Sequence, residues 1–404
     1  MIKTPSSERI TVGLFGMINT GKSSLMNNLF EKNLSIVSKT PGTTTDPVIH
    51  NIELEGLGPV TVFDTAGFDD TGELGNLRKQ KTFEKLELSQ IAVFVTRCDT
   101  ELTEDEKTFL DTCRRLQKEI IIALTFGDLK LYEKKISDLQ EFKTVIIDNI
   151  QNTGTNELKK QLIGLKDKLE YEITPVEGLV NENDLVILVT PIDLAAPKAR
   201  LILPQVETIR DLLDKDCAAL ILKERELKYF YDSLTIKPKL IITDSQAFSK
   251  VSADIPEEQP LTSFSILFAR KKGDLAYFVN GIKHLENTPP NAKILILESC
   301  NHHRQADDIG TVKIPRLFKQ IVKSDAIFEF AKELPEDEKL KEYFLVINCA
   351  GCMVTRAAMI KRINSLKKNN IYGTNYGLFL AWANGLLPRA LEPFPLEYDL
   401  YKKK

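Results

Sequence analysis

The chain of 404 residues has no run of about 18 apolar residues, the length that a membrane-spanning helix needs, and this excludes a transmembrane helix. Residues 1–7 read MIKTPSS and lack a basic segment followed by an apolar stretch, so we expect no signal peptide. Six cysteines are too few for a disulfide framework in so long a chain, and the cytoplasm keeps thiols reduced. We therefore expect a cytoplasmic protein.

Neither sign of charge predominates, because the chain has 54 Lys and Arg residues and 57 Asp and Glu residues, which gives a net charge of −3. This near-balance argues against bulk attraction to nucleic acid or to an anionic membrane, and we expect neither as a partner. The composition, 43% hydrophobic and 27% charged, is typical of a globular protein. The length predicts two or three domains.

The N-terminal part of the chain alternates apolar strands with helices. Strands are expected at residues 10–15, 60–64, 91–96, 120–125 and 145–147, and helices at residues 22–30, 104–118 and 156–171. Continuous apolar strands separated by helices predict a parallel sheet with both faces covered, an α/β fold.

Two smaller α/β units are expected to follow the first. The middle unit has strands at residues 185–190, 218–222 and 240–243 and a helix at 205–214; the last has a helix at 264–271, strands at 292–297 and 344–347, and a helix after Cys352. A linker at 174–178 and a polar stretch at 252–260 separate them. The predicted domains are 1–173, 178–260 and 262–404.

Residues 16–23 read GMINTGKS, a match to the phosphate-binding P-loop, between a strand and a helix as this motif requires. Glycines let backbone amides approach phosphate oxygens, Lys22 reaches the outer phosphates, and the hydroxyl of Ser23 ligates Mg²⁺. We therefore predict binding and hydrolysis of a nucleoside triphosphate. The residues expected to bind the nucleotide from this loop are Gly16, Asn19, Thr20, Gly21, Lys22, Ser23 and Ser24.

A DTAG motif at residues 64–67 supports this reading. Asp64 would hold Mg²⁺ through water, and the amide of Gly67 would sense the γ-phosphate. Residues 41–46 (PGTTTD) lie where a switch loop is expected, and one threonine there would ligate Mg²⁺ when triphosphate is bound. We favour Thr44 over Thr43, which gives Lys22, Thr44, Asp64 and Gly67 as catalytic residues.

The base-recognition motifs of GTPases are degenerate here. The N-K-x-D element reads TFGD at residues 125–128, where Asp128 can still accept hydrogen bonds from guanine, and the S-A-K element reads DNI at 148–150. This pattern predicts a guanine preference with weak affinity.

These motifs resemble the potassium-activated GTPases that include MnmE and Era. Asn19 stands where that group places a K⁺-binding asparagine, and Phe68 stands where Ras-like proteins have a water-positioning glutamine. The resemblance implies that K⁺ replaces an arginine finger. Asp69, Asp70 and Glu73 are unranked candidates for positioning the water, the alternative for each being a solvated loop residue.

Three cysteines late in the chain form a second candidate site. Cys300 follows one predicted strand, and Cys349 and Cys352 follow another, at the edge where α/β sheets bind ligands. Three thiolates suit zinc or an iron–sulfur cluster, while a redox pair and buried structural cysteines are the alternatives. Cys98, Cys113 and Cys217 are expected to be packing residues.

A cluster held by three cysteines lacks one ligand. If residues 298–302 are extended, Glu298, Cys300 and His302 share a face, so Glu298 or His302 can take the fourth position, as can water or an exogenous group. His303 would point the other way.

The order of a P-loop domain, a short middle unit and a domain with Cys-x-His and Cys-x-x-Cys resembles the HydF family, GTPases of FeFe-hydrogenase maturation. Further matching segments are residues 191–198 (PIDLAAPK), 203–210 (LPQVETIR), 307–310 (DDIG), 313–316 (KIPR), 374–377 (TNYG) and 389–394 (RALEPF). One departure is Asn348, which replaces the histidine of the family's His-Cys-x-x-Cys and makes Glu298 or His302 the favoured fourth ligand.

The resemblance implies a homodimeric scaffold that uses GTP, Mg²⁺ and K⁺ and binds a 4Fe–4S cluster. It also implies transfer of a di-iron precursor bearing CO and CN⁻, exchange with the radical enzymes HydE and HydG, and delivery to apo-hydrogenase. Two other functions stay open: a ribosome- or tRNA-associated K⁺-dependent GTPase with structural zinc, and a thiol redox protein that uses Cys349 and Cys352.

Overall fold

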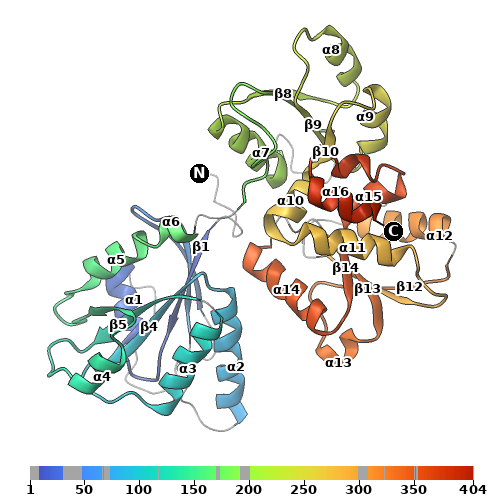
Figure 1. Cartoon of the computed structure of the whole chain (residues 1–404). Helices are drawn as coiled ribbons and strands as arrows, with labels where there is room; N and C mark the ends of the chain where they lie inside the picture. Colours follow the sequence, from blue (N-terminus) through green and yellow to red (C-terminus); the bar gives the residue numbers. More distant parts are fainter. Residues whose placement is uncertain are drawn as a thin grey trace. The chain divides into compact units, whose positions relative to one another are not determined.

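The structure is a computed structural model that describes residues 9–30, 48–65, 67, 73–116, 118–169, 173–191, 201–298, 308–322, 324–349, 351 and 354–403. The chain forms two compact units, Met1–Tyr171 and Glu172–Lys404 (Figure 1). Within the described ranges no helix has the length and apolar character to cross a membrane.

Strands and helices largely alternate along the first unit. In chain order they are β1 (Ile10–Phe15), α1 (Lys22–Phe30), β2 (Val48–Leu54), β3 (Gly58–Asp64), α2 (Glu73–Leu88), β4 (Ile91–Arg97), α3 (Glu104–Arg115), β5 (Glu119–Thr125), α4 (Glu133–Asp138), β6 (Lys143–Ile146), α5 (Thr155–Ile163) and α6 (Lys166–Leu169). The strands form one sheet in the order β2-β3-β1-β4-β5-β6, in which only β2 is antiparallel to its neighbour.

Helices cover both faces of this sheet, which explains why its central strands are continuously apolar. Figure 1 shows α1 and α5 on one face, where their apolar side chains pack on Val12, Val62 and Val93. On the other face α2 and α3 surround an aromatic cluster, in which the ring centroid of Phe109 lies 5.3 Å from that of Phe15 and 5.2 Å from that of Phe94.

Every strand predicted for this unit is present, with ends shifted by no more than two residues. The strand β2 was not predicted, because this edge strand is mostly exposed and lacks a continuous apolar run. The single helix predicted at residues 156–171 is interrupted. It ends at Ile163 with Gly164 as its C-cap, and α6 follows. Glycine is a poor residue for a helix interior, so a break there is favoured.

The second unit contains two parallel sheets of four strands each, in the orders β10-β9-β7-β8 and β12-β11-β13-β14. Its first half consists of β7 (Leu185–Val189), α7 (Leu203–Asp214), β8 (Ala218–Leu222), α8 (Leu227–Ser233), β9 (Leu240–Thr243), α9 (Phe248–Asp254), β10 (Leu261–Ser263) and α10 (Phe264–Lys272). Its second half consists of α11 (Leu275–Leu285), β11 (Lys293–Leu297), the π-helical turn η2 (Ile309–Lys313), α12 (Ile314–Val322), β12 (Ile327–Ala331), α13 (Asp337–Leu340), β13 (Tyr343–Asn348), α14 (Arg356–Lys368), β14 (Tyr372–Asn375), α15 (Tyr376–Ala383), the 3₁₀ turn η3 (Arg389–Leu391) and α16 (Pro395–Lys402).

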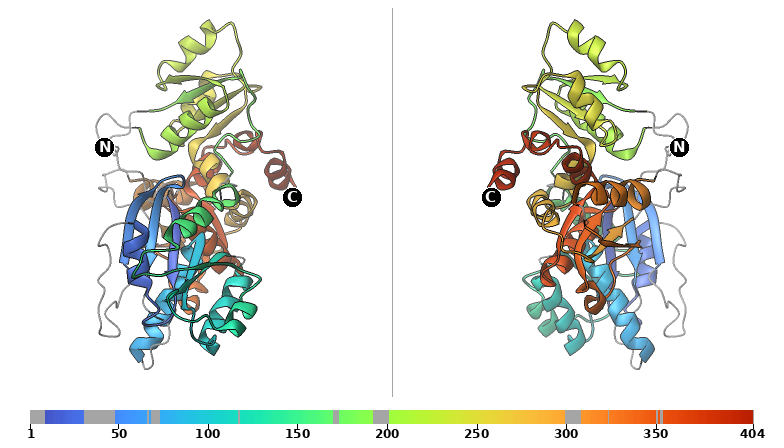
Figure 2. Two further views of the ribbon diagram at one scale, coloured as in Figure 1. Left: turned by 90° about the vertical axis from the view of Figure 1, so that its left-hand side faces the viewer. Right: turned by 90° about the vertical axis from the view of Figure 1, so that its right-hand side faces the viewer.

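Both sheets share one topology: the first strand in sequence is central, the second lies on one side of it, and the third and fourth lie on the other. The direction of strand addition therefore reverses between β7 and β9 and again between β11 and β13. Such a reversal opens a crevice at the carboxyl ends of the two strands, where α/β sheets bind ligands. Figures 1 and 2 show α15 and α16, drawn in red, beside α11.

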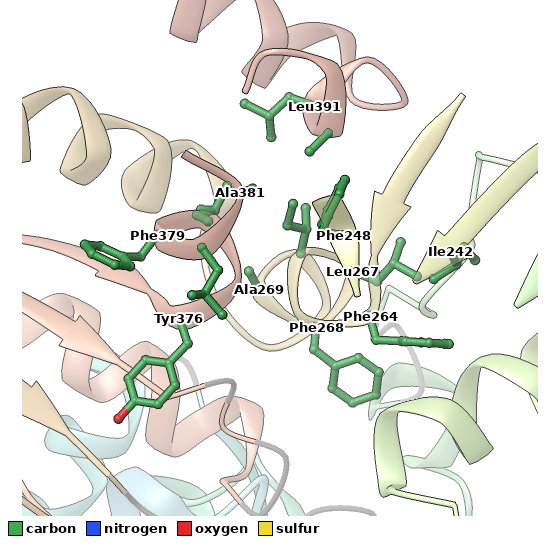
Figure 3. Packing of buried hydrophobic residues seen from close by; sticks show 14 of the residues in the cluster. Ile242, Phe248, Phe264, Leu267, Phe268, Ala269, Tyr376, Phe379, Ala381 and Leu391 are labelled. Atoms are coloured by element: carbon green, nitrogen blue, oxygen red, sulfur yellow. The ribbon is translucent and has the colours of Figure 1, made fainter. Parts of the chain in front are cut away.

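One hydrophobic core joins the two sheets of the second unit. Figure 3 shows Phe264, Leu267, Phe268 and Ala269 of α10 at its centre, between Ile242 and Phe248 from the first half and Phe379 and Ala381 of α15. Because α10 packs against both halves, its position links them. The domain limits 178–260 and 262–404 stay a prediction, as does the limit at 173.

Candidate active site and metal centre

The P-loop connects β1 to α1 and is shaped by two glycines. A Cβ atom at Gly16 would lie 2.1 Å from the carbonyl oxygen of Val95, and Gly21 has φ +83°. A Cβ atom at Gly21 would also lie 2.8 Å from Nδ2 of Asn149. Both positions therefore require glycine, since any other residue would clash with backbone or with a bracing side chain.

Lys22 is the first residue of α1, and its side chain folds back over the loop. Its Nζ donates to the carbonyl oxygens of Gly16 at 2.9 Å and Met17 at 2.5 Å, and the residue is only 8% exposed. The ammonium group is thus held inside the loop whose amides and helix dipole attract phosphate. The role of Lys22 at the outer phosphates stays a prediction.

Two side chains from distant strands brace the P-loop. The hydroxyl of Thr125, at the end of β5, donates to the carbonyl oxygen of Thr20 at 2.7 Å. The amide of Asn149, after β6, donates to the carbonyl oxygen of Gly21 at 3.2 Å, and Asn28 of α1 donates to the carbonyl oxygen of Asn149 at 2.8 Å. From the sequence Thr125 and Asn149 were expected only as members of degenerate base motifs, whereas in the structure they hydrogen-bond to the backbone of the loop.

Phe126 stands where the base motif usually has lysine. Its φ is +59°, and the guanidinium carbon of Arg97 lies 3.9 Å from its ring centroid, a cation–π contact. Arg97 also donates to both carboxylate oxygens of Asp99, at 3.0 and 2.8 Å, and this hydrogen bonding lowers the pKa of Asp99. Asp128 follows on the same loop and is exposed.

Some of the remaining residues predicted for the nucleotide site lie near the P-loop, and the others lie outside the residues that the structure describes. Asp64 is buried at the end of β3, and the hydroxyl of the next residue, Thr65, donates to the carbonyl oxygen of Leu14 of β1 at 2.6 Å. Ser23 and Ser24 lie in the first turn of α1, Asn19 is exposed with φ +61°, and Gly67 is described. The residues that lie outside the described chain are Thr43, Thr44, Phe68, Asp69 and Asp70, together with the side chain of Glu73.

A buried ion pair beneath the end of β4 was not predicted. Lys135 and Glu106 have side chains 1% and 4% exposed, with Nζ 3.8 Å from Oε2. Nζ of Lys135 donates to the hydroxyl of Thr96 at 2.7 Å and to the carbonyl oxygen of Arg97 at 2.9 Å, and Thr96 in turn donates to Glu106. Burial lowers the pKa of Lys135, and the charge of Glu106 opposes this. Glu106 also closes a capping box with Thr103 at the start of α3. The capping pattern was the one available sequence signal.

The candidate metal centre lies at the switch point between β11 and β13. The amide of Cys349 donates to the carbonyl oxygen of Leu297 at 2.9 Å, so β11 and β13 end side by side. Cys349 is buried, and Glu298 follows directly on β11, its amide bonded to the carbonyl oxygen of Ala331 at 2.9 Å. Cys300, His302, His303 and Cys352 lie outside the described residues, and the described ones contain no group of three metal-ligating side chains.

Of the three candidate cysteines the structure describes Cys349, which is buried where β11 and β13 end side by side, and a thiolate at that place fits a soft metal or an iron–sulfur cluster. Asn348, 1% exposed, donates its amide to the carbonyl oxygen of Thr374 at 3.3 Å, so its amide nitrogen is engaged with β14. Cys98, Cys113 and Cys217 are all buried, as predicted.

Three family models match the chain. The model of the hydrogen maturase F dimerization domain matches residues 176–273, and that of the hydrogen maturase F tetramerization domain matches residues 276–393. The model of the 50S ribosome-binding GTPase matches residues 11–126, which hold the P-loop. The two hydrogen maturase F models together match more than half of the chain, and both describe domains of self-association.

The curated relatives match less than half of this chain. The tRNA modification GTPase MnmE of Thermoanaerobacter sp. (strain X514) is 31% identical over 178 residues, which are 43% of this chain and 38% of that protein. MnmE of Clostridioides difficile (strain 630) is 30% identical over 185 residues, 45% of this chain and 38% of that protein. The chain thus spans well under half the length of these relatives.

The solved structures that resemble this chain are only distantly similar to it. Era from Aquifex aeolicus bound to GDP·AlF₄⁻ is 16% identical, covers 60% of this chain and 97% of its own, and has a TM-score of 0.35. Likenesses this weak carry no argument, so the assignment rests on the family models, on the sheet order and on the P-loop geometry. The mixed α/β chain has an N-terminal P-loop GTPase domain and belongs to the hydrogen maturase F family.

Proposed function

We propose that this protein is a GTP-hydrolysing scaffold that binds a 4Fe–4S cluster and assembles or delivers the di-iron precursor of FeFe-hydrogenase. The observation that carries the proposal is the hydrogen bond from the amide of Cys349 to the carbonyl oxygen of Leu297. It supports the proposal because β11 and β13, the strands that Cys300 and Cys349 follow in the sequence, end side by side in a sheet that matches a hydrogen maturase F domain, in a chain that also has a P-loop.

In the GTPase domain Lys22 would neutralise the outer phosphates, and Ser23, Thr44 and Asp64 would hold Mg²⁺ directly or through water. The amide of Gly67 would sense the γ-phosphate, and Asp128 would select guanine. Asn19 would help to hold K⁺ beside the phosphates. GTP turnover would be slow and would gate partner binding rather than drive the metal chemistry.

In the second unit Cys300, Cys349 and Cys352 would ligate the cluster, with Glu298 or His302 in the fourth position. A bound 4Fe–4S cluster supplies a one-electron centre and an iron that can carry an exchangeable ligand. The middle domain would form a homodimer. The partners would be the radical enzymes HydE and HydG, which supply the precursor, and the apo-hydrogenase, which receives it.

The test is anaerobic iron and sulfide quantification with low-temperature EPR. Wild type is compared with a variant in which Cys300, Cys349 and Cys352 are all replaced by Ala. About four irons per chain and a reduced-cluster signal, both lost in the variant, are the expected result. Zinc in wild type, or no metal, would overturn the scaffold proposal and favour a GTPase with a structural metal site or another target.

Replacing Asn19 by Ala should reduce the stimulation of GTP hydrolysis by K⁺ relative to Na⁺, because the amide oxygen would no longer ligate the ion. Turnover is measured in matched K⁺ and Na⁺ buffers. Asn156→Ala on the exposed start of α5 is the matched control and should keep the wild-type ratio. An unchanged ratio in Asn19→Ala would remove the assignment of this cation site.

Replacing Glu298 by Ala should change the EPR spectrum of the reduced cluster without preventing its assembly, because three cysteines remain. Glu298 immediately follows β11, so its carboxylate is one residue beyond the contact between Leu297 and Cys349. Glu338→Ala on α13 serves as the control. A spectrum identical to wild type would assign the fourth position to His302, water or an exogenous group.

A further inference from the structure

An aromatic ring stacked on an arginine lies at the carboxyl end of β5, on the side of the sheet edge that holds the P-loop. The ring is that of Phe126, which is half-buried, and the guanidinium carbon of Arg97 lies 3.9 Å from its centroid. Phe126 follows the last residue of β5, and Arg97 is the last residue of β4, its parallel neighbour. Neither side chain was predicted to contact the nucleotide.

Hydrogen bonding and packing place Phe126 next to the P-loop. The hydroxyl of the preceding residue, Thr125, lies 2.7 Å from the carbonyl oxygen of Thr20. Its Cγ2 atom is 3.7 Å from where a Cβ atom at Gly21 would stand. Met17 of the loop and Phe126 pack against the same hydrophobic cluster, the one between the sheet and α2 and α3. A nucleotide whose phosphates occupy the P-loop therefore has this ring within reach of its base.

The backbone of Phe126 is held in a conformation that bulky residues rarely adopt. Its φ is +59°, in the left-handed region. Its carbonyl oxygen accepts from the thiol of Cys98 and from the amide of Leu129, each at 2.9 Å, and the amide of Cys98 donates to the carbonyl oxygen of Thr125 at 3.0 Å. Such strain persists only where the surroundings hold it, and it is concentrated at ligand sites. The fold therefore specifies where this residue stands.

Arg97 is itself fixed from two sides. Its guanidinium donates to both carboxylate oxygens of Asp99, at 3.0 and 2.8 Å, and its carbonyl oxygen accepts from Nζ of the buried Lys135 at 2.9 Å. A guanidinium held in one plane by two parallel bonds keeps its face on the ring. The carboxylate of Asp99 also balances the charge of Arg97, so this group acts on a nucleotide through the ring rather than through its charge.

The loop after β5 offers stacking and one carboxylate to a base. The hydroxyl of Thr125 lies 2.7 and 3.1 Å from two backbone carbonyl oxygens, Phe126 has an apolar side chain and Gly127 has none. Asp128, which is exposed, is the member of this loop that can accept hydrogen bonds from the edge of guanine. An aromatic ring stacks on any base, because each base has a π face. Affinity and selectivity therefore fall to different residues.

We propose that Phe126, backed by Arg97, is the surface on which the base of the bound nucleotide stacks, and that it sets the affinity for purine nucleotides in general while Asp128 selects guanine. Phe126 is thus a binding residue, and Arg97 is a positioning residue that acts through the ring. The proposal rests on the proposed role of Asp128 and on nucleotide binding at the P-loop, and it is independent of any metal cluster.

The test is calorimetric binding of GDP and of inosine diphosphate, whose base lacks the exocyclic amino group of guanine, to the full-length protein. Phe126→Leu keeps an apolar side chain against the hydrophobic cluster and removes the π face. We expect the Kd of both nucleotides to rise by the same factor, about tenfold. Phe126→Tyr keeps the ring and should bind like wild type. Asp128→Ala should weaken GDP more than inosine diphosphate, because guanine loses the acceptor for two donors and hypoxanthine for one.

A second arginine stack in the same unit provides the matched control. The guanidinium carbon of Arg114 lies 5.0 Å from the ring centroid of Phe142, which directly precedes β6 and so lies at the opposite end of the parallel strands from Phe126. Phe142→Leu and Arg114→Met should leave both Kd values unchanged. Arg97→Met should raise both by about two- to fivefold, because the ring loses the cation that holds it.

Steady-state GTP hydrolysis separates this role from a merely structural one. The stack touches the base and not the phosphates, so Phe126→Leu and Arg97→Met should raise KM and leave kcat within about twofold of wild type. A fall in kcat as large as the rise in KM would show that the substitutions distort the P-loop through Thr125, and it would overturn the stacking role.

The remaining outcomes distinguish this proposal from the function proposed above. A wild-type Kd in Phe126→Leu overturns the stacking role, and so does an equal rise in Phe142→Leu. A rise for GDP alone would assign selectivity to Phe126 and overturn the division of roles. Failure of wild type to bind either nucleotide would refute the nucleotide site and this proposal with it. Absence of iron from wild type would refute the scaffold function and leave the stacking role standing.

Discussion

Replacing Lys22 by Ala should lower the rate of GTP hydrolysis by at least about 10²–10³-fold, the usual effect of removing one preorganised group that stabilises transition-state charge. The structure supports a large effect, because the ammonium group is buried in the loop and bonded to the carbonyl oxygens of Gly16 and Met17. The hydroxyl of Thr20 also donates to the carbonyl oxygen of Met17, at 2.9 Å, but it carries no positive charge. Water cannot replace a fixed cation there without a loss of charge stabilisation.

The measurement is single-turnover GTP hydrolysis with Mg²⁺ and K⁺. Lys160→Ala on the exposed face of α5 is the control and should hydrolyse GTP at the wild-type rate. Iron content should be the same in both variants, because Cys300, Cys349 and Cys352 belong to the other unit. Hydrolysis by Lys22→Ala within a few-fold of wild type would show that the P-loop is not the reacting site.

Replacing Lys135 by Met should destabilise the GTPase unit by about 3–5 kcal/mol, the typical loss when one member of a buried ion pair is removed. The carboxylate of Glu106, 4% exposed, would then be buried without its cation. The hydroxyl of Thr96 and the carbonyl oxygen of Arg97 would lose a donor as well. Because Thr96 and Arg97 end the strand beside the base motif, nucleotide binding should weaken before the unit unfolds.

Cys113 provides a local probe of this unfolding. It is fully buried on α3, and burial raises the pKa of its thiol to about 12, so it should react with an alkylating reagent only when the unit opens. Alkylation of its peptide is followed by mass spectrometry across a urea series. Lys135→Met should shift the midpoint to lower urea, and the double variant with Glu106→Gln should recover most of the loss, since it removes the uncompensated charge and keeps the capping side chain. Equal midpoints for wild type and Lys135→Met would show that the pair contributes nothing to stability.

Much of this molecule could be predicted from local sequence. The central strands of the first unit are continuous apolar segments bounded by turns. The P-loop is a contiguous motif, and its glycines are required because a side chain at those positions would clash. Each is encoded by residues close together in the chain, so periodicity and spacing suffice to find them. The same reasoning predicted the two strands that Cys300 and Cys349 follow in the sequence. It therefore also predicted that both strands end at the same edge of one sheet. It did not find β2, whose exposed face resembles a loop.

The contacts that make these motifs precise were decided only by the tertiary structure. The hydroxyl of Thr125 donates to the carbonyl oxygen of Thr20, 105 residues away, and the amide of Asn149 donates to that of Gly21, 128 residues away. Two motifs that look degenerate for base recognition thus support the P-loop. The ion pair of Lys135 with Glu106 and the hydrogen bond from Lys272 to the carbonyl oxygen of Gly351 also join residues that are distant in the sequence. A hydrogen bond depends on atoms within about 3 Å of one another, and which distant residues come that close follows from how sheets and helices pack. The sequence by itself therefore determined the motifs and the fold class of this protein, while packing decided which lysine, threonine or asparagine stands beside them.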